Sequence, residues 1–270
     1  GSRGACTSCH PRHSFAIEIA RKPSTCGQCH LEPDVPAFNV YKSSKHGTIY
    51  EGFEKKFDFT SVPWVIGKDF TAPTCATCHN SLVTDKDGNI IAERSHDFGD
   101  RLWVRIFGLP YAHNQPKTPK TFEIRNADGL ALPTTFENLH AKDFLIDENE
   151  VSARKATMRN ICTSCHGTSW VNSHFMNLDS TVITTNNMTK VATELVSKAW
   201  DMKMADNSNP FDEPIEQEWV LSWLFYSNSI RYARAMMGPD YAGFKNGWFD
   251  LSNTIQKMRS SVKNYDQSKR

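Results

Sequence analysis

One five-residue pattern recurs four times along the chain and uses all eight of its cysteines. In each copy two cysteines stand three residues apart, and a histidine follows the second one directly. This is the attachment signature of c-type haem, because the two thiols match the vinyl groups on one porphyrin edge and the histidine reaches the iron. The cysteine pairs are Cys6/Cys9, Cys26/Cys29, Cys75/Cys78 and Cys162/Cys165, and the proximal ligands are His10, His30, His79 and His166.

Other uses of paired cysteines fit this pattern poorly. A thioredoxin-like redox pair occurs once in a chain, and a zinc ribbon does not require a histidine after every pair. Structural disulfides do not repeat one spacing four times. The sequence therefore predicts four covalently bound haem c groups. Because haem is joined to thiols only outside the cytoplasm, we expect a periplasmic or extracellular protein whose signal peptide has been removed.

Six further histidines are candidates for the distal ligands of the irons, of which four haems need at most four. His13 is only three residues from His10, so it is expected to serve a neighbouring haem. Gly47, beside His46, would let the backbone pass close to a porphyrin face. The alternative for each is an ordinary surface or hydrogen-bonded histidine. His113 could also face a substrate, or support a ligand of the iron without binding the iron itself. The six candidates are His13, His46, His96, His113, His140 and His174.

The charge balance narrows the range of partners. The chain has 31 basic and 30 acidic residues, a formal net charge of +1. A nucleic-acid-binding protein would show a basic stripe or patch, so no nucleic-acid partner is expected. No apolar run approaches the length of a membrane span. The expected partners are redox proteins or further copies of this chain, as a homo-oligomer or a filament.

The expected fold is mainly α, a multihaem cytochrome packed around its haems. Residues 1–137 form a loop-rich region with three of the motifs, and residues 138–270 form a helical region with the fourth. The two regions are expected to make one continuous domain. Two Asp-Gly turns, at 87–88 and 128–129, are each flanked by apolar pairs and predict short β-hairpins.

Helices are expected over residues 184–204, 214–237 and 250–263. The second begins after Asp212 and Glu213 with a proline in its first turn, and Gly238 followed by proline stops it. At roughly 35 Å it is longer than a small domain must cover. Its apolar stripe could therefore face the core or another subunit. The tail from 263 to 270 is expected to be solvated or extended.

Several stretches resemble the hydroxylamine oxidoreductase family, which includes the hydrazine dehydrogenases and nitrite-reducing relatives. Nearly the whole chain takes part in this resemblance, which implies the fold of a protein with eight haems. This chain has four motifs and resembles the C-terminal part of that family. Among the matching stretches are CHPRHSF (9–15), CGQCHLEPDVP (26–36), ARKATMRNICTSCHGTSWVNSHF (153–175) and SNPFDEPIEQEWVLSWLFY (208–226).

The resemblance also implies an enzyme pocket, from which this chain departs. The family's Asp-His pair is Asp34-Val35 here, so the histidine general acid–base is missing at that position. An enzyme would act on hydroxylamine, hydrazine or nitrite at one five-coordinate haem, with His10 as its proximal ligand and Asp34 and Tyr241 in the pocket. The family is usually trimeric.

The preferred hypothesis is an electron carrier with every iron capped by two histidines. In its polymeric form, His13 ligates a haem of the adjacent copy in an extracellular filament. A non-catalytic subunit that relays the electrons of an enzyme is a third hypothesis.

Overall fold

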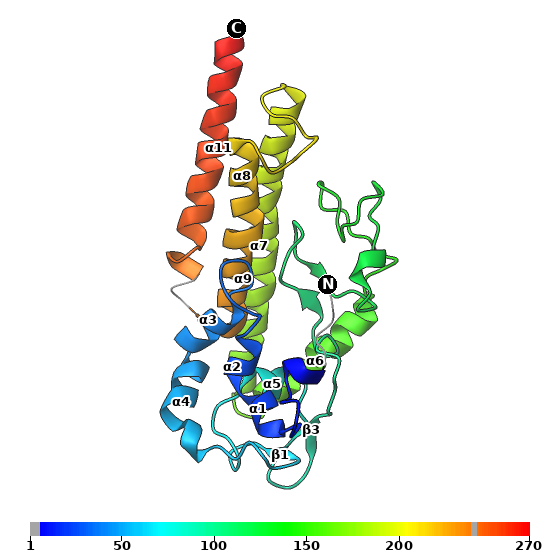
Figure 1. The fold of residues 1–270 in the computed structure, drawn as a ribbon, viewed down its shortest axis with the longest axis vertical. Helices are drawn as coiled ribbons and strands as arrows, with labels where there is room; N and C mark the ends of the chain where they lie inside the picture. The colour runs from blue at the N-terminus through cyan, green and yellow to red at the C-terminus, as the bar shows by residue number, and fades with distance from the viewer. Residues whose placement is uncertain (1–5, 239–241) are drawn as a thin grey trace. The chain divides into compact units, whose positions relative to one another are not determined.

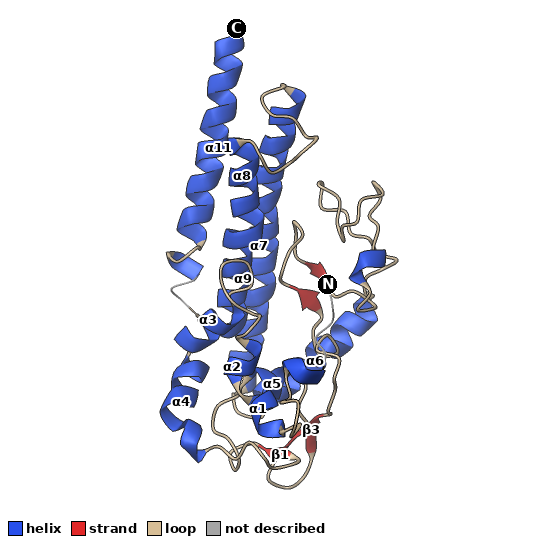
Figure 2. Ribbon diagram, in the orientation of Figure 1, coloured by secondary structure: helices blue, strands red, loops and turns tan. Residues whose placement is uncertain are grey.

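The computed structural model describes residues 6–238 and 242–270, which form two compact units that interleave along the chain. Unit 1 comprises Gly1–Glu32, Pro36–Trp103 and Glu148–Phe175, and unit 2 comprises Pro33–Val35, Val104–Asp147 and Met176–Arg270. The sequence-based division into a loop-rich region, residues 1–137, and a helical region, residues 138–270, stays a prediction. Figure 2 shows mostly helix with a few short strands, which confirms the mainly α class.

Unit 1 joins short helices to a small sheet. Strands β1 and β2 are parallel, and β2 and β3 form an antiparallel hairpin. The hairpin expected at the first Asp-Gly turn is confirmed, since the Asp85 carboxylate accepts the N–H groups of Asp87 and Asn89 and Gly88 has a φ of +86°. The elements of unit 1 are η1 (Cys6–Ser8), α1 (Ile17–Arg21), α2 (Pro23–Cys26), α3 (Ala37–Ser43), α4 (Lys45–Phe53), η2 (Glu54–Lys56), β1 (Trp64–Val65), α5 (Cys75–His79), β2 (Val83–Thr84), β3 (Ile90–Ala92), α6 (Glu148–Thr163) and the first turns of α7 (Thr168–Asp201).

Unit 2 is a set of long helices with two small additions. Figure 1 shows α8 and α9 beside the long α7, and α11 packs against α8 and α9. Its elements are β4 (Val104–Arg105), β5 (His113–Asn114), η3 (Thr121–Glu123), the greater part of α7, α8 (Pro214–Val220), the π-helical segment η4 (Leu221–Tyr226), α9 (Ser227–Met236) and α11 (Trp248–Lys269). None of the described helices, α7 included, has an apolar stretch that could cross a bilayer.

The second expected hairpin, around residues 128–129, is wrong. Within the described chain the turn is present without a strand ladder, and residues 121–123 form η3 instead. The reason lies in Asn126, whose side-chain oxygen accepts the N–H groups of Asp128 and Leu130. Its amide also donates to the Thr134 carbonyl. These side-chain bonds use the groups that a ladder would pair.

The predicted long helices are confirmed. The helix expected at 214–237 runs through α8, η4 and α9, and Glu213 and Glu216 form the capping box at its start. It ends at Met237, which takes the left-handed conformation, and the Gly238 N–H bonds back to the Ala233 carbonyl at 2.8 Å. The helix expected at 184–204 is the C-terminal part of α7, which begins earlier, at Thr168, and ends at Asp201.

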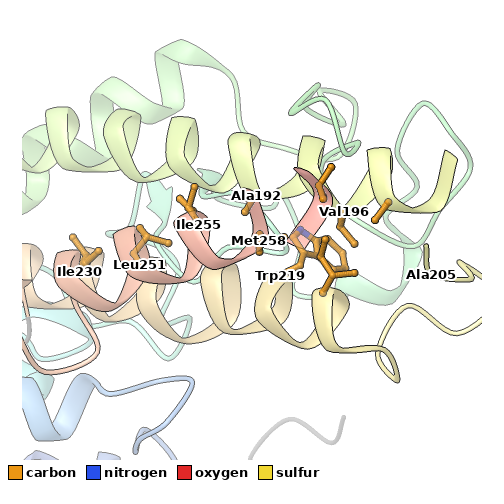
Figure 3. Close-up of a cluster of buried hydrophobic side chains, with 11 residues drawn as sticks. Ala192, Val196, Ala205, Trp219, Ile230, Leu251, Ile255 and Met258 are labelled. Carbon is orange, nitrogen blue, oxygen red and sulfur yellow. The ribbon is translucent and has the colours of Figure 1, made fainter. Parts of the chain in front are cut away.

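The apolar stripe of this helix packs inside unit 2. Figure 3 shows Trp219 and Ile230 facing Leu251, Ile255 and Met258 of α11. The rest of this buried cluster comes from α7, the loop after it, the start of α8 and the second half of α11. These residues are Ala192, Val196, Ala199, Ala205, Ile215 and Val262. Burial of these side chains stabilises unit 2 by the hydrophobic effect.

The tail from 263 to 270 is solvated, as expected, but it is helical and not extended, because α11 continues to Lys269. The Tyr265 hydroxyl donates to the Lys203 carbonyl at 3.0 Å, and Arg270 forms an ion pair one turn back with Asp266 at 3.0 Å. Both contacts support helical geometry beyond residue 263.

Candidate haem centres

Each CxxCH segment forms one helical turn, which brings its three functional side chains to one face. In three motifs the backbone N–H of the histidine donates to the backbone carbonyl of the first cysteine. The distances are 2.9 Å for His10, 3.0 Å for His30 and 2.9 Å for His166. The third motif is helix α5 itself. Residues at positions i, i+3 and i+4 of a helical turn lie on the same face. Both thiols and the imidazole of each motif therefore point to one side, a donor set that fits haem c.

All four motifs belong to unit 1, where the first motif lies near the second and a hydrogen bond joins the second to the third. Burial raises the pKa of the Cys9 thiol, and the neighbouring Cys26 and Cys29 of the second motif raise it further. The Cys26 thiol in turn shares a hydrogen bond with the Cys75 thiol of the third motif. This bond lowers the pKa of Cys26 and raises that of Cys75.

The third motif is likewise close to the fourth. Burial raises the pKa of Cys78 to about 12, and Cys162 and Cys165 act in the same direction. His30 of the second motif lies near His79 of the third, where its positive form lowers the pKa of the buried His79 imidazole. The four motifs thus follow one another in space in the order in which they occur in the chain.

Two contacts hold the third motif in place. The His79 imidazole donates a hydrogen bond to the Phe98 carbonyl, which fixes its tautomer and leaves the other nitrogen for iron. Arg101, which is 3% exposed, donates to the carbonyls of Cys78 at 3.3 Å and Ser81 at 2.7 Å, and also to that of Glu93. This buried cation caps the end of α5 and places a positive charge beside the motif.

Among the six distal candidates, His46 has a ring that lies beside a proximal histidine, His166. The ring centroids of His46 and His166 are 6.0 Å apart, at an interplanar angle of 44°. Imidazole nitrogens bind metal ions at about 2 Å, so two axial rings on one iron have centroids roughly 6 Å apart. Trp170 stacks on His166 at 4.3 Å and restrains that ring. Burial lowers the pKa of His46, and His166 lowers it further.

Gly47 is required by its own backbone surroundings, whereas the expected close approach to a porphyrin stays a prediction. A Cβ at this position would lie 2.1 Å from the carbonyl oxygen of Tyr41, so α4 can begin directly beside α3 only with glycine here. The Ser44 hydroxyl caps the same turn by accepting the Gly47 N–H at 3.2 Å. Together these contacts set the start of the helix that carries His46.

The remaining candidates have different surroundings. His13 and His96 are exposed in unit 1. The His174 ring is parallel to that of Trp170 at 5.5 Å. His113 and His140 belong to unit 2. His113 is 2% exposed with its Nδ1 2.6 Å from the Asn114 carbonyl oxygen, and burial lowers its pKa to about 3.

The alternative catalytic set stays a prediction, because its members are divided between the two units and the undescribed residues. His10 belongs to unit 1 and Asp34 to unit 2. Tyr241 lies outside the described residues. Within unit 2, Asp34 is an electrostatic neighbour of Tyr232, whose pKa is raised to about 12 by burial and by this carboxylate, while Arg105 opposes the shift.

Sequence reasoning missed the buried arginines of both units. Arg21, Arg101 and Arg231 are 2%, 3% and 0% exposed. Nothing in their local patterns distinguishes them from the other basic residues of the chain. Burial of a guanidinium depends on partners that are distant in the sequence.

Comparison with known proteins identifies related sequences and folds. Residues 2–99 match the family model described as "Seven times multi-haem cytochrome CxxCH". A solved "Hypothetical multiheme protein" is 42% identical with a TM-score of 0.91, over 100% of this chain and 60% of that one. A reducing HAO-like protein complex of Kuenenia stuttgartiensis has a TM-score of 0.72 at 19% identity, over 97% of this chain and 59% of that one.

A curated relative from the same organism is a probable nitrite reductase-hydroxylamine oxidoreductase fusion protein. It is 39% identical over 93 residues, which cover 30% of this chain and 11% of the relative. The chain thus spans about 60% of the solved relatives and a small part of the curated one.

The motifs and these matches define a multihaem c-type cytochrome with covalently bound haem c. The expected resemblance to the hydroxylamine oxidoreductase family is confirmed, and the fold is that of an HAO-like protein. Cytochromes of this class are typically exported proteins.

Proposed function

We propose that this chain carries four haem c groups and transfers electrons along them outside the cytoplasm. The observation that supports this most directly is the succession of the four motifs within unit 1, each of which lies near the next. Haem c supplies one-electron chemistry at its iron. The chain's own residues ligate the irons, exclude water from them and set their potentials through burial and nearby charge.

His46 is proposed as the distal ligand opposite His166. An iron that holds two imidazoles has no position for a substrate, so such a centre transfers electrons without binding one. His13, His96 and His174, which also belong to unit 1, are proposed as caps for the other irons. This ligation favours an electron carrier or relay over an enzyme.

Electron paramagnetic resonance of the oxidised protein tests this function. We expect four low-spin ferric haems whose signals do not change when hydroxylamine is added, because each iron has two histidine ligands. The intact mass of the same sample is expected to exceed that of the polypeptide by four haems. A high-spin haem that responds to hydroxylamine would contradict the proposal, and a mass with fewer haems would contradict the count.

His13 supports a finer proposal, an extracellular filament in which this histidine ligates a haem of the next copy. Its side chain is exposed, close to the first motif. In His13→Ala we expect filaments to be lost in electron micrographs and one haem to become high-spin. The neighbouring exposed Arg12→Ala is the matched control and should assemble. Assembly of His13→Ala with all haems six-coordinate would exclude this mode of contact.

The second candidate is an enzyme that acts on hydroxylamine, hydrazine or nitrite. It is favoured by the fusion relative and by the proximity of Asp34 to Tyr232, which offers a carboxylate and a phenol in one part of unit 2. Its proposed reaction centre is the haem of His10. The hydroxylamine experiment separates the two candidates, since only an open iron can bind that molecule.

A further inference from the structure

Trp170 lies between two histidines at the start of α7. Its ring is stacked on that of His166, with the centroids 4.3 Å apart and the planes 22° apart. The ring of His174 is parallel to that of Trp170 within 1°, with the centroids 5.5 Å apart. The three residues follow one another at four-residue steps, the spacing that places successive side chains of a helix on one face. Trp170 therefore separates the two imidazoles.

The rings continue from His174 into the interior of unit 1. The Phe175 ring meets that of His174 edge-on at 5.5 Å, and Trp103 stacks on Phe175 at 5.2 Å. Phe175 and Trp103 are both buried. We call Trp103, Phe175, His174, Trp170 and His166 the ring column. Close packing in the interior fixes its inner end, and its outer end is the proximal histidine of the fourth motif.

Helix α6 holds the inner end of the ring column from the side. Lys155 lies over the Trp103 ring at 5.6 Å, and Arg159, one turn further along α6, lies over the Phe175 ring at 5.2 Å. Both distances are within the range of a cation–π contact. Arg159 also donates a hydrogen bond to Asn172 of α7. These contacts join α6 to the first turns of α7 and limit the movement of the ring column.

An imidazole that binds iron in one defined plane needs a contact that stops it from rotating. For His79 this contact is its hydrogen bond to the Phe98 carbonyl. His166 instead has the indole of Trp170 lying flat against it. We infer that Trp170 is a positioning residue, which fixes the plane of the His166 imidazole and thereby the angle between the two axial ligands of the haem at the fourth motif.

This angle has a spectroscopic consequence, because the orientation of the axial ligands sets the electronic structure of a low-spin ferric haem. Electron paramagnetic resonance reports that structure through the g values of the haem. The planes of His46 and His166 are 44° apart. A fixed angle gives one narrow signal, whereas a ring that can rotate gives a range of angles and a broad signal. The inference rests on the proposed ligation of one iron by His46 and His166.

Trp170→Leu in the oxidised holoprotein tests this role by electron paramagnetic resonance. We expect one low-spin signal to broaden and its largest g value to shift, and this should be the signal that His46→Ala removes. All haems should stay low-spin, because His166 still binds its iron. Trp170→Phe keeps a flat ring against His166 and is expected to retain the wild-type signal.

Phe53→Leu is the matched control. It removes an aromatic ring that is 47% exposed from α4, the helix that carries His46. Trp170 is itself 42% exposed, and exposed substitutions have small effects on stability, so both leucine variants should fold. The control should leave every haem signal unchanged.

Two outcomes would overturn the inference. The first is a Trp170→Leu spectrum that equals that of Phe53→Leu, or one in which the signal of a different haem changes. The second is a Trp170→Phe spectrum that changes as much as that of Trp170→Leu, because a stacked ring would then not be what matters at this position. Failure of the proposed electron carrier is distinct from both, since it would appear in the wild type as a high-spin haem that responds to hydroxylamine.

Discussion

His46→Ala is expected to convert one haem from low-spin to high-spin while the other haems stay unchanged. The physical reason is the 6.0 Å separation of the His46 and His166 rings, which suits two axial ligands of one iron. Without the distal imidazole that iron becomes five-coordinate. Electron paramagnetic resonance and the visible spectrum of the ferric protein measure the change, and added imidazole should restore the low-spin signal.

Two further variants make this result specific. His46→Met keeps a sixth ligand, so the haem should stay low-spin while its potential rises, as thioether ligation does in cytochromes c. Lys45→Ala alters the same first turn of α4 at an exposed side chain and should leave every haem low-spin. If His46→Ala retains only low-spin haems, the assignment of His46 to this iron is wrong.

Arg231→Met is expected to lower the free energy of unfolding by about 3–5 kcal/mol, the range for breaking a buried charged network. Arg231 is 0% exposed. Its Nε donates to Thr185 at 2.8 Å, and its Nη2 donates to Asn186 at 2.7 Å. Its Nη1 donates to Asn228 at 3.1 Å and to the Ile106 carbonyl at 3.3 Å. This one side chain therefore connects α7, α9 and the segment after β4.

The loss follows from the acceptors that remain buried. Asn186 also holds both the N–H and the carbonyl of Ala112, and Asn228 accepts the Gly108 N–H, so the segment from 106 to 112 would lose its anchor. Chemical denaturation followed by circular dichroism measures the change. Arg259→Met, at an exposed position of α11, is the control and should stay within about 0.5 kcal/mol of the wild type. Equal denaturation midpoints for the two variants would show that the network is not needed for stability.

The haem sites were predictable because their geometry is local. Two cysteines and a histidine at i, i+3 and i+4 need only one helical turn to reach the same face, and each described motif makes that turn. The helix at 214–236 was equally predictable, since its capping box, its proline and its apolar period all act within a few residues. The same local rules failed at residues 121–132, where the side chain of Asn126 takes the bonds of the expected ladder.

What the sequence by itself determined is therefore the class of protein, its cofactor and its long helices. Only the tertiary structure decided that the His46 ring lies beside that of His166, 120 residues further along the chain. It also decided that Arg21 and Arg231 are buried, whereas most basic residues lie at the surface. Spacing encodes contacts within a turn. The pairing of distant side chains and the burial of a charge depend on how the whole chain packs, and no local pattern carries that information.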